Sequence, residues 1–205
     1  MVLRKKKLEI VLSKLDNPPF PRPKLEQYTI PPKLAAELLY ISSFIHQDIR
    51  DKKVADLGTG SGLLAIGAGL IGAKYVVGVD IDPSVIKVAW RNAQKLSVDV
   101  EWVIADIAAI KGPFDTVVMN PPFGTKRRHM DRLFLSKAMT MAQVIYSLHK
   151  QTTRQYLCHF IGLNRGFVDA IFPMELEIPH VFPFHTRKKY TVNVDLYRIL
   201  MNYNR

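Results

Sequence analysis

The feature that most constrains this chain is a glycine loop between an apolar run and a helical pattern. The apolar run 54–57 leads into Gly58-Thr59-Gly60-Ser61-Gly62, and the helix-like segment 62–69 follows. Glycine is needed where the backbone takes a positive φ or approaches a ligand closely. A strand, a glycine loop and a helix in this order favour a nucleotide-cofactor site in an α/β fold.

Two acidic residues follow the loop at places where an adenosine cofactor needs acceptors. Asp80 ends the next apolar run, about twenty residues after the loop, and its carboxylate can accept hydrogen bonds from both ribose hydroxyls. Asp106 ends the third run and precedes Ile107. The loop is spaced Gly-x-Gly-x-Gly after Asp56, unlike the dinucleotide fingerprint, and no Walker lysine follows it, so a phosphate-cradling loop is not expected.

This spacing and its leading acid resemble motif I of the Rossmann-like S-adenosylmethionine methyltransferases. The resemblance implies that S-adenosylmethionine is the cofactor, that Asp80 holds its ribose, and that Asp106 accepts from the adenine amino group beside Ile107. The cofactor-binding residues expected in this part of the chain are Asp56, Gly58, Gly60, Ser61, Leu63, Asp80, Ile81, Asp106 and Ile107.

Beyond the loop, short apolar runs alternate with helical patterns, which is typical of an α/β sheet. The runs expected as strands are 54–57, 75–80, 100–105, 114–119, 144–149, 167–178 and 191–200, and the expected helices are 33–45, 62–69, 83–95, 130–141 and 152–163. The last two runs lack a helix-length connection, which predicts an antiparallel pair at the end of the sheet. We therefore predict a Rossmann-like α/β fold of about seven mostly parallel strands with helices on both faces.

Residues 1–32 are expected to form an N-terminal helix and a proline-rich arm within a single domain spanning 1–205. Segment 2–15 predicts an amphipathic helix whose apolar positions are Leu3, Ile10, Val11 and Leu15. The proline-rich stretch 17–23 cannot join a helix or a central strand, and Pro31-Pro32 opens the next helix.

The tetrapeptide Asn-Pro-Pro-Phe occurs at 17–20 and again at 120–123. The first copy lies in the proline-rich stretch with no strand before it, so we interpret it as structural. The second follows an apolar run and therefore lies at the carboxyl edge of a strand, where open α/β sheets bind ligands. We expect the catalytic residues to be Asn120, Pro121, Pro122 and Phe123.

These residue types suit methyl transfer to a planar amino group whose lone pair is delocalised. The Asn120 side-chain oxygen and the Pro121 carbonyl can accept hydrogen bonds from the two amino hydrogens, and proline holds that carbonyl rigidly. The ring of Phe123 can stack on a base. The cofactor sulfonium supplies the driving force, so positioning carries much of the rate, and Asn120 is also expected to contact the cofactor.

The chain carries 29 Lys and Arg against 18 Asp and Glu, which gives a formal net charge of +11. Such a field attracts polyanions, with nucleic acid first and an anionic membrane surface second. Lys126, Arg127 and Arg128 directly follow the catalytic motif, and they can hold phosphates beside a target nucleotide.

Cysteine and histidine usage indicates no metal site and a reducing compartment. Cys158 is the single cysteine, and the six histidines are scattered. No apolar stretch reaches the roughly 18 residues of a membrane span, and the N-terminus lacks a signal-like apolar region. We expect a soluble, cytoplasmic protein.

Several motifs occur together in a fixed order along nearly the whole chain. They are 25–28 (Leu-Glu-Gln-Tyr), the loop 56–62, Gly-Val-Asp-Ile-Asp at 78–82, the segment 114–124 with Lys126, Tyr-Ser-Leu-His-Lys at 146–150, and a basic stretch 185–189 leading into 192–196. Together they resemble the methyltransferase-like protein five family, which comprises small-subunit rRNA adenine-N6 methyltransferases and their archaeal relatives.

That resemblance implies roles for residues outside the glycine loop. Gln27 and Tyr28 would close over the methionine part of the cofactor. The family commonly places a threonine where this chain has Ile30, and Thr29 stands one position early. The eukaryotic members work with a small zinc-ribbon activator protein that covers an exposed strand, and an equivalent partner is implied here.

Three alternatives to an adenine-N6 methyltransferase remain open at this point: two other acceptors and one non-enzyme. Asn-Pro-Pro-aromatic motifs also serve guanine-N2 methylation and methylation of a protein glutamine amide, because all these acceptors are planar, weakly nucleophilic amino groups. Phenylalanine at 123 and the basic charge favour RNA. The third alternative is a basic RNA-binding module that has lost catalysis, and the intact Gly58, Gly60, Asp80 and Asn120 argue against it.

Overall fold

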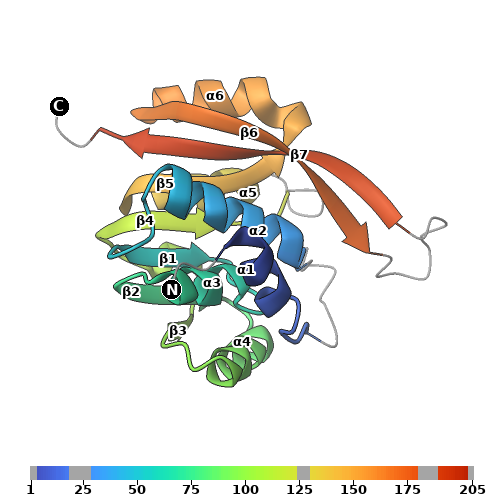
Figure 1. Ribbon diagram of the computed structural model, residues 1–205. Coiled ribbons are helices and arrows are strands. Elements are labelled where there is room, and N and C mark those ends of the chain that lie inside the picture. The colour runs from blue at the N-terminus through green and yellow to red at the C-terminus, as the bar shows by residue number, and fades with distance from the viewer. Residues whose placement is uncertain (1–3, 19–28, 124–129, 180–188, 203–205) are drawn as a thin grey trace.

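The computed structural model describes residues 4–18, 29–123, 130–179 and 189–202. Its centre is a seven-stranded sheet in the order β3-β2-β1-β4-β5-β7-β6 (Figure 1). The parallel strands are β1 (Lys53–Leu57), β2 (Tyr75–Asp80), β3 (Glu101–Ile104), β4 (Phe114–Met119) and β5 (Ala142–Lys150). β7 (Lys189–Met201) runs antiparallel to β5 and to the edge strand β6 (Gly166–Pro179). The predicted sheet and its antiparallel C-terminal pair are confirmed.

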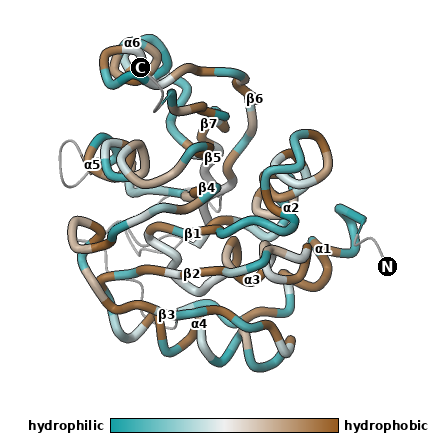
Figure 2. The backbone as a smooth tube through the Cα atoms, turned by 90° about the vertical axis from the view of Figure 1, so that its left-hand side faces the viewer, coloured by the Kyte–Doolittle hydropathy of each residue, from teal (hydrophilic) through white to brown (hydrophobic). Residues whose placement is uncertain are grey.

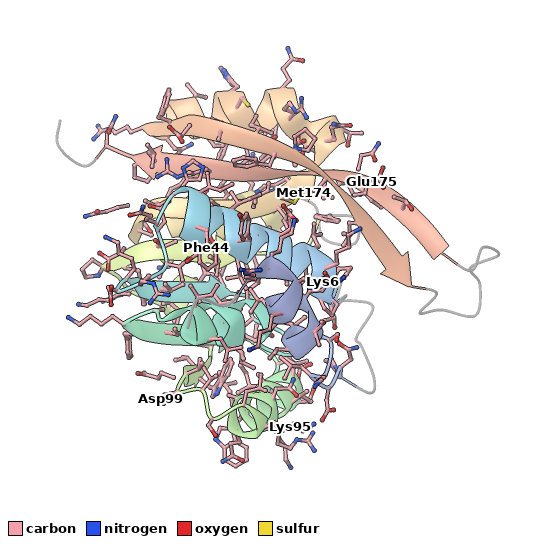
Figure 3. All side chains as sticks on the ribbon, viewed as in Figure 1. Lys6, Phe44, Lys95, Asp99, Met174 and Glu175 are labelled. Carbon is pink, nitrogen blue, oxygen red and sulfur yellow. The ribbon has the colours of Figure 1, made fainter. Side chains whose placement is uncertain are left out.

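Helices cover both faces of the sheet. One face carries α1 (Lys5–Leu12), α2 (Pro32–Tyr40) with the π-helical turn η2 (Ile41–Ile45), α3 (Leu63–Ile71) and α4 (Pro83–Lys95). The other carries α5 (Met130–Met139) and α6 (Arg154–Leu163), with the single 3₁₀ turns η3 (Ile107–Ala109) and η4 (Gln151–Thr153) (Figure 2). Side chains fill both layers between helices and sheet (Figure 3).

The strand order reverses between β1 and β4. These neighbours pair in parallel, with Val54 opposite Thr116 and Asp56 opposite Val118. Because ligands bind outside the carboxyl ends of strands at such a switch point, the segments that follow β1 and β4 define the functional edge of the sheet. Those segments are the glycine loop and the second Asn-Pro-Pro-Phe copy.

The N-terminal helix packs into the core, although one of its predicted apolar positions is wrong. Leu8, Leu12 and Leu15 are buried against α2 and α3, whereas Ile10 is 50% exposed and Val11 is half-buried. Helical periodicity explains this result, because residues four apart share a face and Ile10 lies between them on the other side. Leu3 lies outside the described residues.

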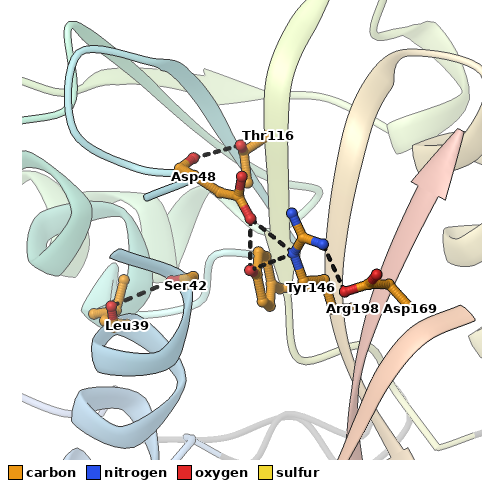
Figure 4. A network of polar contacts seen from close by, with 7 residues as sticks. All are labelled: Leu39, Ser42, Asp48, Thr116, Tyr146, Asp169 and Arg198. Atoms are coloured by element: carbon orange, nitrogen blue, oxygen red, sulfur yellow. Dashed lines mark hydrogen bonds and ion pairs between the residues drawn. The ribbon is translucent and has the colours of Figure 1, made fainter. Parts of the chain in front are cut away.

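A buried polar network fastens the C-terminal strands to the parallel sheet (Figure 4). Asp48 precedes β1, and its Oδ2 lies 2.9 Å from Arg198 Nε of β7 and accepts a 2.7 Å hydrogen bond from Tyr146 of β5. Arg198 also pairs with Asp169 of β6 at 2.7 Å, and Thr116 Oγ1 of β4 donates to the Asp48 carbonyl. Burial raises the pKa of Tyr146, so the phenol remains a donor.

β6 and β7 extend beyond the end of β5. The last β5–β7 pair is Lys150 with Val194, whereas β6–β7 pairing continues to Pro179 with Lys189. Met174 packs against the core while Glu175 is exposed, so this extension keeps the alternation of a strand with one covered face (Figure 3). No helix in the described part of the chain is long and apolar enough to cross a membrane.

Candidate active site at the carboxyl edge of the sheet

The glycine loop takes a conformation that requires glycine at two positions in particular. Gly60 has φ +54°, and a Cβ placed on it would meet no atom within 4 Å, so the loop faces open space at this point. Gly62 has φ +87° and begins α3, and a Cβ there would lie 2.8 Å from the Trp102 ring. The first glycine therefore opens the backbone to a ligand, and the second lets α3 pack against β3.

Asp56 organises the loop from beneath. Its Oδ2 accepts hydrogen bonds from Thr59 Oγ1 at 2.6 Å and from the Ala65 N–H at 3.0 Å. Its Oδ1 is buried and lacks a hydrogen-bond partner among the described residues. Burial raises the pKa of this carboxyl to about 7, because the charged form loses its hydration.

Asp80 is oriented by backbone groups at the end of β2. Its Oδ2 accepts from the Gly60 N–H and its Oδ1 from the Asp82 N–H, both at 3.0 Å. Burial raises the pKa of Asp80, and these two hydrogen bonds oppose that shift. Each carboxylate oxygen has a further lone pair, so the fixed carboxylate retains acceptor capacity for hydroxyl groups.

Of the other residues expected to bind the cofactor, Asp106 and Ile107 at its adenine among them, some are exposed and some are buried. Asp106 is exposed and accepts from the Ala108 N–H at 2.9 Å, which fixes its carboxylate at the start of η3. Ile81 is 53% exposed beside Asp80. Ile107 instead packs in the core beneath α5, and Leu63 is also buried. Ile81 therefore exposes more apolar surface than Ile107 or Leu63, and it directly follows Asp80.

One organising residue escaped the sequence reasoning. Asn92 of α4 donates from Nδ2 to the Ser61 carbonyl of the glycine loop and to the Asp16 carbonyl of the N-terminal arm, both at 3.0 Å. Its Oδ1 accepts from the Asp16 N–H at 2.9 Å. Asn92 is fully buried, and buried amides need partners, but this burial is visible only in the structure.

The N-terminal cofactor contacts are only partly described. Ile30 packs in the core, which makes it a structural residue, and Thr29 is half-buried. Gln27 and Tyr28 lie outside the described residues, as do Lys126, Arg127 and Arg128.

The second Asn-Pro-Pro-Phe copy follows β4, as predicted. Asn120 is half-buried, and its Oδ1 is a buried acceptor without a hydrogen-bond partner among the described residues. Pro121 is buried, Pro122 and Phe123 are half-buried, and Lys150 Nζ lies 5.7 Å from the centre of the Phe123 ring. An unpaired amide oxygen in this position suits a donor group brought by a ligand, because buried polar atoms are normally satisfied.

Two other sequence features lie outside the candidate site: the first Asn-Pro-Pro-Phe copy and the Ser147–His149 pair. In the first Asn-Pro-Pro-Phe copy, Asn17 is exposed and belongs to no helix or strand, so no strand end places it at the binding edge. Ser147 Oγ and His149 Nε2 lie 2.7 Å apart on a buried face of β5, and burial lowers the pKa of His149 to about 3. This pair is part of the core.

The described residues fit an adenosine cofactor across the ends of β1 and β2. Gly60 leaves open space, Asp80 is held with spare acceptor capacity, and two buried oxygens of the loop, Asp56 Oδ1 and Ser61 Oγ, lack partners among the described residues. Asn120 reaches the same edge from β4. The candidate cofactor site therefore lies beside the hydrogen-bond acceptor of Asn120.

Known proteins resemble this chain over its whole length. Residues 38–121 match the model of the ribosomal protein L11 methyltransferase (PrmA) family. The rRNA N(6)-adenosine-methyltransferase METTL5 of Danio rerio is 35% identical over 203 residues, covering 96% of this chain and 98% of that protein. The chain belongs to the METTL5 family. Mettl5 of Drosophila melanogaster is 36% identical over 205 residues, covering 96% of each.

A solved structure supports the same assignment. The crystal structure of a candidate RNA methyltransferase from Pyrococcus horikoshii superimposes with a TM-score of 0.90 at 38% identity, covering 98% of this chain and 99% of that one. The Rossmann-like methyltransferase fold is therefore confirmed. This METTL5-family chain is a methyltransferase that uses S-adenosylmethionine.

Proposed function

We propose that this chain transfers the methyl group of S-adenosylmethionine to N6 of an adenosine in small-subunit ribosomal RNA. The observation that carries the proposal is the Asn120 Oδ1, which is buried and has no hydrogen-bond partner among the described residues. It lies at the end of β4, one strand from the glycine loop and three residues before Phe123. Named METTL5 relatives at 35% and 36% identity are rRNA adenosine methyltransferases.

The residues of this chain would act by positioning. Asn120 Oδ1 and the Pro121 carbonyl accept hydrogen bonds from the two hydrogens of the adenine amino group, and this favours a more tetrahedral nitrogen. Phe123 stacks on the base, which must be unpaired or flipped out of a helix. When bound, S-adenosylmethionine would supply an electrophilic methyl group, and the amino nitrogen would accept it with release of one proton to water. Positioning then carries much of the rate.

The acceptor side of the site favours RNA over a protein substrate. The match to the L11 methyltransferase family ends at Pro121, before Phe123, so it covers the cofactor half and not the residues after the motif. Lys126, Arg127 and Arg128 would hold phosphates beside the target nucleotide, and Gln27, Tyr28 and Thr29 would cover the methionine part of the cofactor.

We further propose that a small zinc-ribbon activator covers the β3 edge of the sheet. Among the strands of the described ranges, β3 pairs with β2 alone, and Ile104, its last residue, is 57% exposed. An unpaired edge strand with exposed apolar side chains is suited to strand addition by a partner. The chain would act in the cytoplasm, which a single cysteine is consistent with.

The test is methyl transfer from labelled S-adenosylmethionine to total ribosomal RNA, followed by nucleoside digestion and mass spectrometry. We expect N6-methyladenosine from the wild type and none from Asn120→Ala, with cofactor affinity in the variant nearly unchanged by calorimetry. N2-methylguanosine would overturn the acceptor, and full activity of the variant would overturn the mechanism.

A further inference from the structure

Three side chains of α5 and α6 form a cluster at the surface. Arg132 Nη1 donates a 3.1 Å hydrogen bond to Tyr156 Oη, and the guanidinium carbon lies 5.9 Å from the centre of the Phe160 ring. The rings of Tyr156 and Phe160 are stacked, with centroids 6.2 Å apart and planes 20° from parallel. We call Arg132, Tyr156 and Phe160 the Arg132 cluster.

The cluster orients a guanidinium through two contacts and leaves most of its donors unused. Phe160 packs against the core, and Tyr156 is 47% exposed. A guanidinium has five N–H donors, of which Tyr156 takes one. No carboxylate in the described ranges forms an ion pair with Arg132. A preorientated arginine beside an exposed ring suits a phosphate together with a stacked base.

Topology places the cluster at the catalytic edge of the sheet. α5 follows β4 and leads back to the start of β5, so its first turn, which contains Arg132, lies at the carboxyl edge. α6 follows β5 and leads back to the start of β6, so its first turn, which contains Tyr156, lies at the same edge. Both helices cover the same face (Figure 2).

Lys150 lies beside the catalytic motif, at the edge of the sheet where α5 and α6 begin. It is the last residue of β5, and η4 joins it directly to α6. Its ammonium lies 5.7 Å from the centre of the Phe123 ring, and its side chain makes no ion pair with any carboxylate that the structure describes. Phe123 packs on the face of the sheet that α1, α2 and α3 cover, whereas the Arg132 cluster lies on the other face. A strand that contacts both must therefore cross the carboxyl edge, where Lys150 ends β5.

We propose that the RNA strand next to the target adenosine runs from Phe123 past Lys150 to the Arg132 cluster. Lys150 holds a phosphate of the target nucleotide, Arg132 holds a phosphate farther along the strand, and the Tyr156 ring stacks on a flanking base. The proposal rests on the RNA substrate of the proposed function. Alternating cations and aromatic rings are the means by which proteins bind single-stranded RNA.

A different role for the cluster, as a contact that only joins α5 to α6, predicts a different salt dependence. For a single strand, the logarithm of the association constant falls by about 0.7 for each phosphate neutralised per unit of log salt concentration. Loss of a helix–helix contact leaves this slope unchanged. Loss of a phosphate contact reduces it.

The experiment measures binding of a single-stranded polyuridine RNA that carries one central adenosine, by fluorescence anisotropy across a salt series. Arg132→Gln should weaken binding roughly tenfold at low salt and reduce the slope by about 0.7. Arg132→Lys should keep the slope, and Tyr156→Ala should lose affinity with the slope unchanged. Arg50→Gln is the matched control, because Arg50 is exposed before β1 at the opposite edge.

A minimal RNA substrate distinguishes the contribution of Lys150 from that of Arg132. Turnover of a substrate with one nucleotide on each side of the adenosine should fall with Lys150→Gln and remain unchanged with Arg132→Gln. If Arg132→Gln matches Arg50→Gln in affinity and slope while the wild type methylates RNA, the proposed path is wrong and the proposed function stands. If the slope falls as expected but the wild type methylates no RNA, the path is supported and the proposed function is overturned.

Discussion

Asp56→Asn should change how the stability of this protein depends on pH. Burial of Asp56 raises its pKa from the ordinary 3.8 to about 7. Between these values the unfolded chain has released the proton and the folded chain keeps it, so the stability contributed by this carboxyl is fully present below pH 4 and is lost as pH rises through 7. A shift of roughly 3 pKa units corresponds to about 4 kcal/mol across that window.

The assay is urea unfolding at a series of pH values, followed by the fluorescence of Trp90 and Trp102. The difference in unfolding free energy, variant minus wild type, removes every group common to both proteins. It should rise by up to about 4 kcal/mol between pH 4 and pH 7.5, whatever constant offset the substitution adds. Asp51→Asn, in an exposed turn, is the matched control for loss of one carboxylate.

A difference that stays flat across this pH range would refute the reasoning. It would mean that Asp56 ionises in the folded protein as readily as in the unfolded chain. The hydrogen bonds from Thr59 and Ala65 would then outweigh the loss of hydration on burial.

Three further substitutions test other parts of the structure. For His149→Gln, the unfolding free energy of the variant minus that of the wild type should change with pH in the opposite direction. Burial lowers the pKa of His149 to about 3, so its contribution to stability is lost as pH falls from 6.5. Urea unfolding at pH 4 and pH 7 would detect the change. Arg198→Met should destabilise the protein by about 3 kcal/mol, since it leaves the buried Asp48 without its cation, and Asp48→Asn added to it should recover part of that loss in urea unfolding. Asp80→Ala should weaken S-adenosylmethionine binding roughly tenfold or more, through the lost ribose hydrogen bonds, and unchanged affinity by calorimetry would contradict its assigned role.

Much of the fold could be predicted from local patterns. β2, β4 and α4 begin and end where the sequence places them, because an apolar run or a Pro at a helix start marks each boundary within a few residues. The face of α1 could not be predicted as well. Leu8 and Ile10 are both apolar, and only the position of α2 and α3 decides which of them is buried.

The candidate site shows the same division. Asn120 could be distinguished from Asn17 in sequence, because a strand precedes only the second motif and strand ends form the binding edge. Asn92 could not be identified as an organiser of the glycine loop, since its partners Asp16 and Ser61 are 76 and 31 residues away.

The sequence by itself determined the order of strands, helices and loops along the chain, because these depend on short-range chemistry and spacing. Its motifs also carried the resemblance that indicated the cofactor class, and they pointed to the tetrapeptide that we propose as catalytic. Only the tertiary structure brought Lys150 over Phe123 and Arg132 over Phe160. Each of these pairs joins side chains from different elements, and their approach depends on sheet pairing and helix packing. Such contacts are set by the summed burial of the whole core, which no local pattern contains.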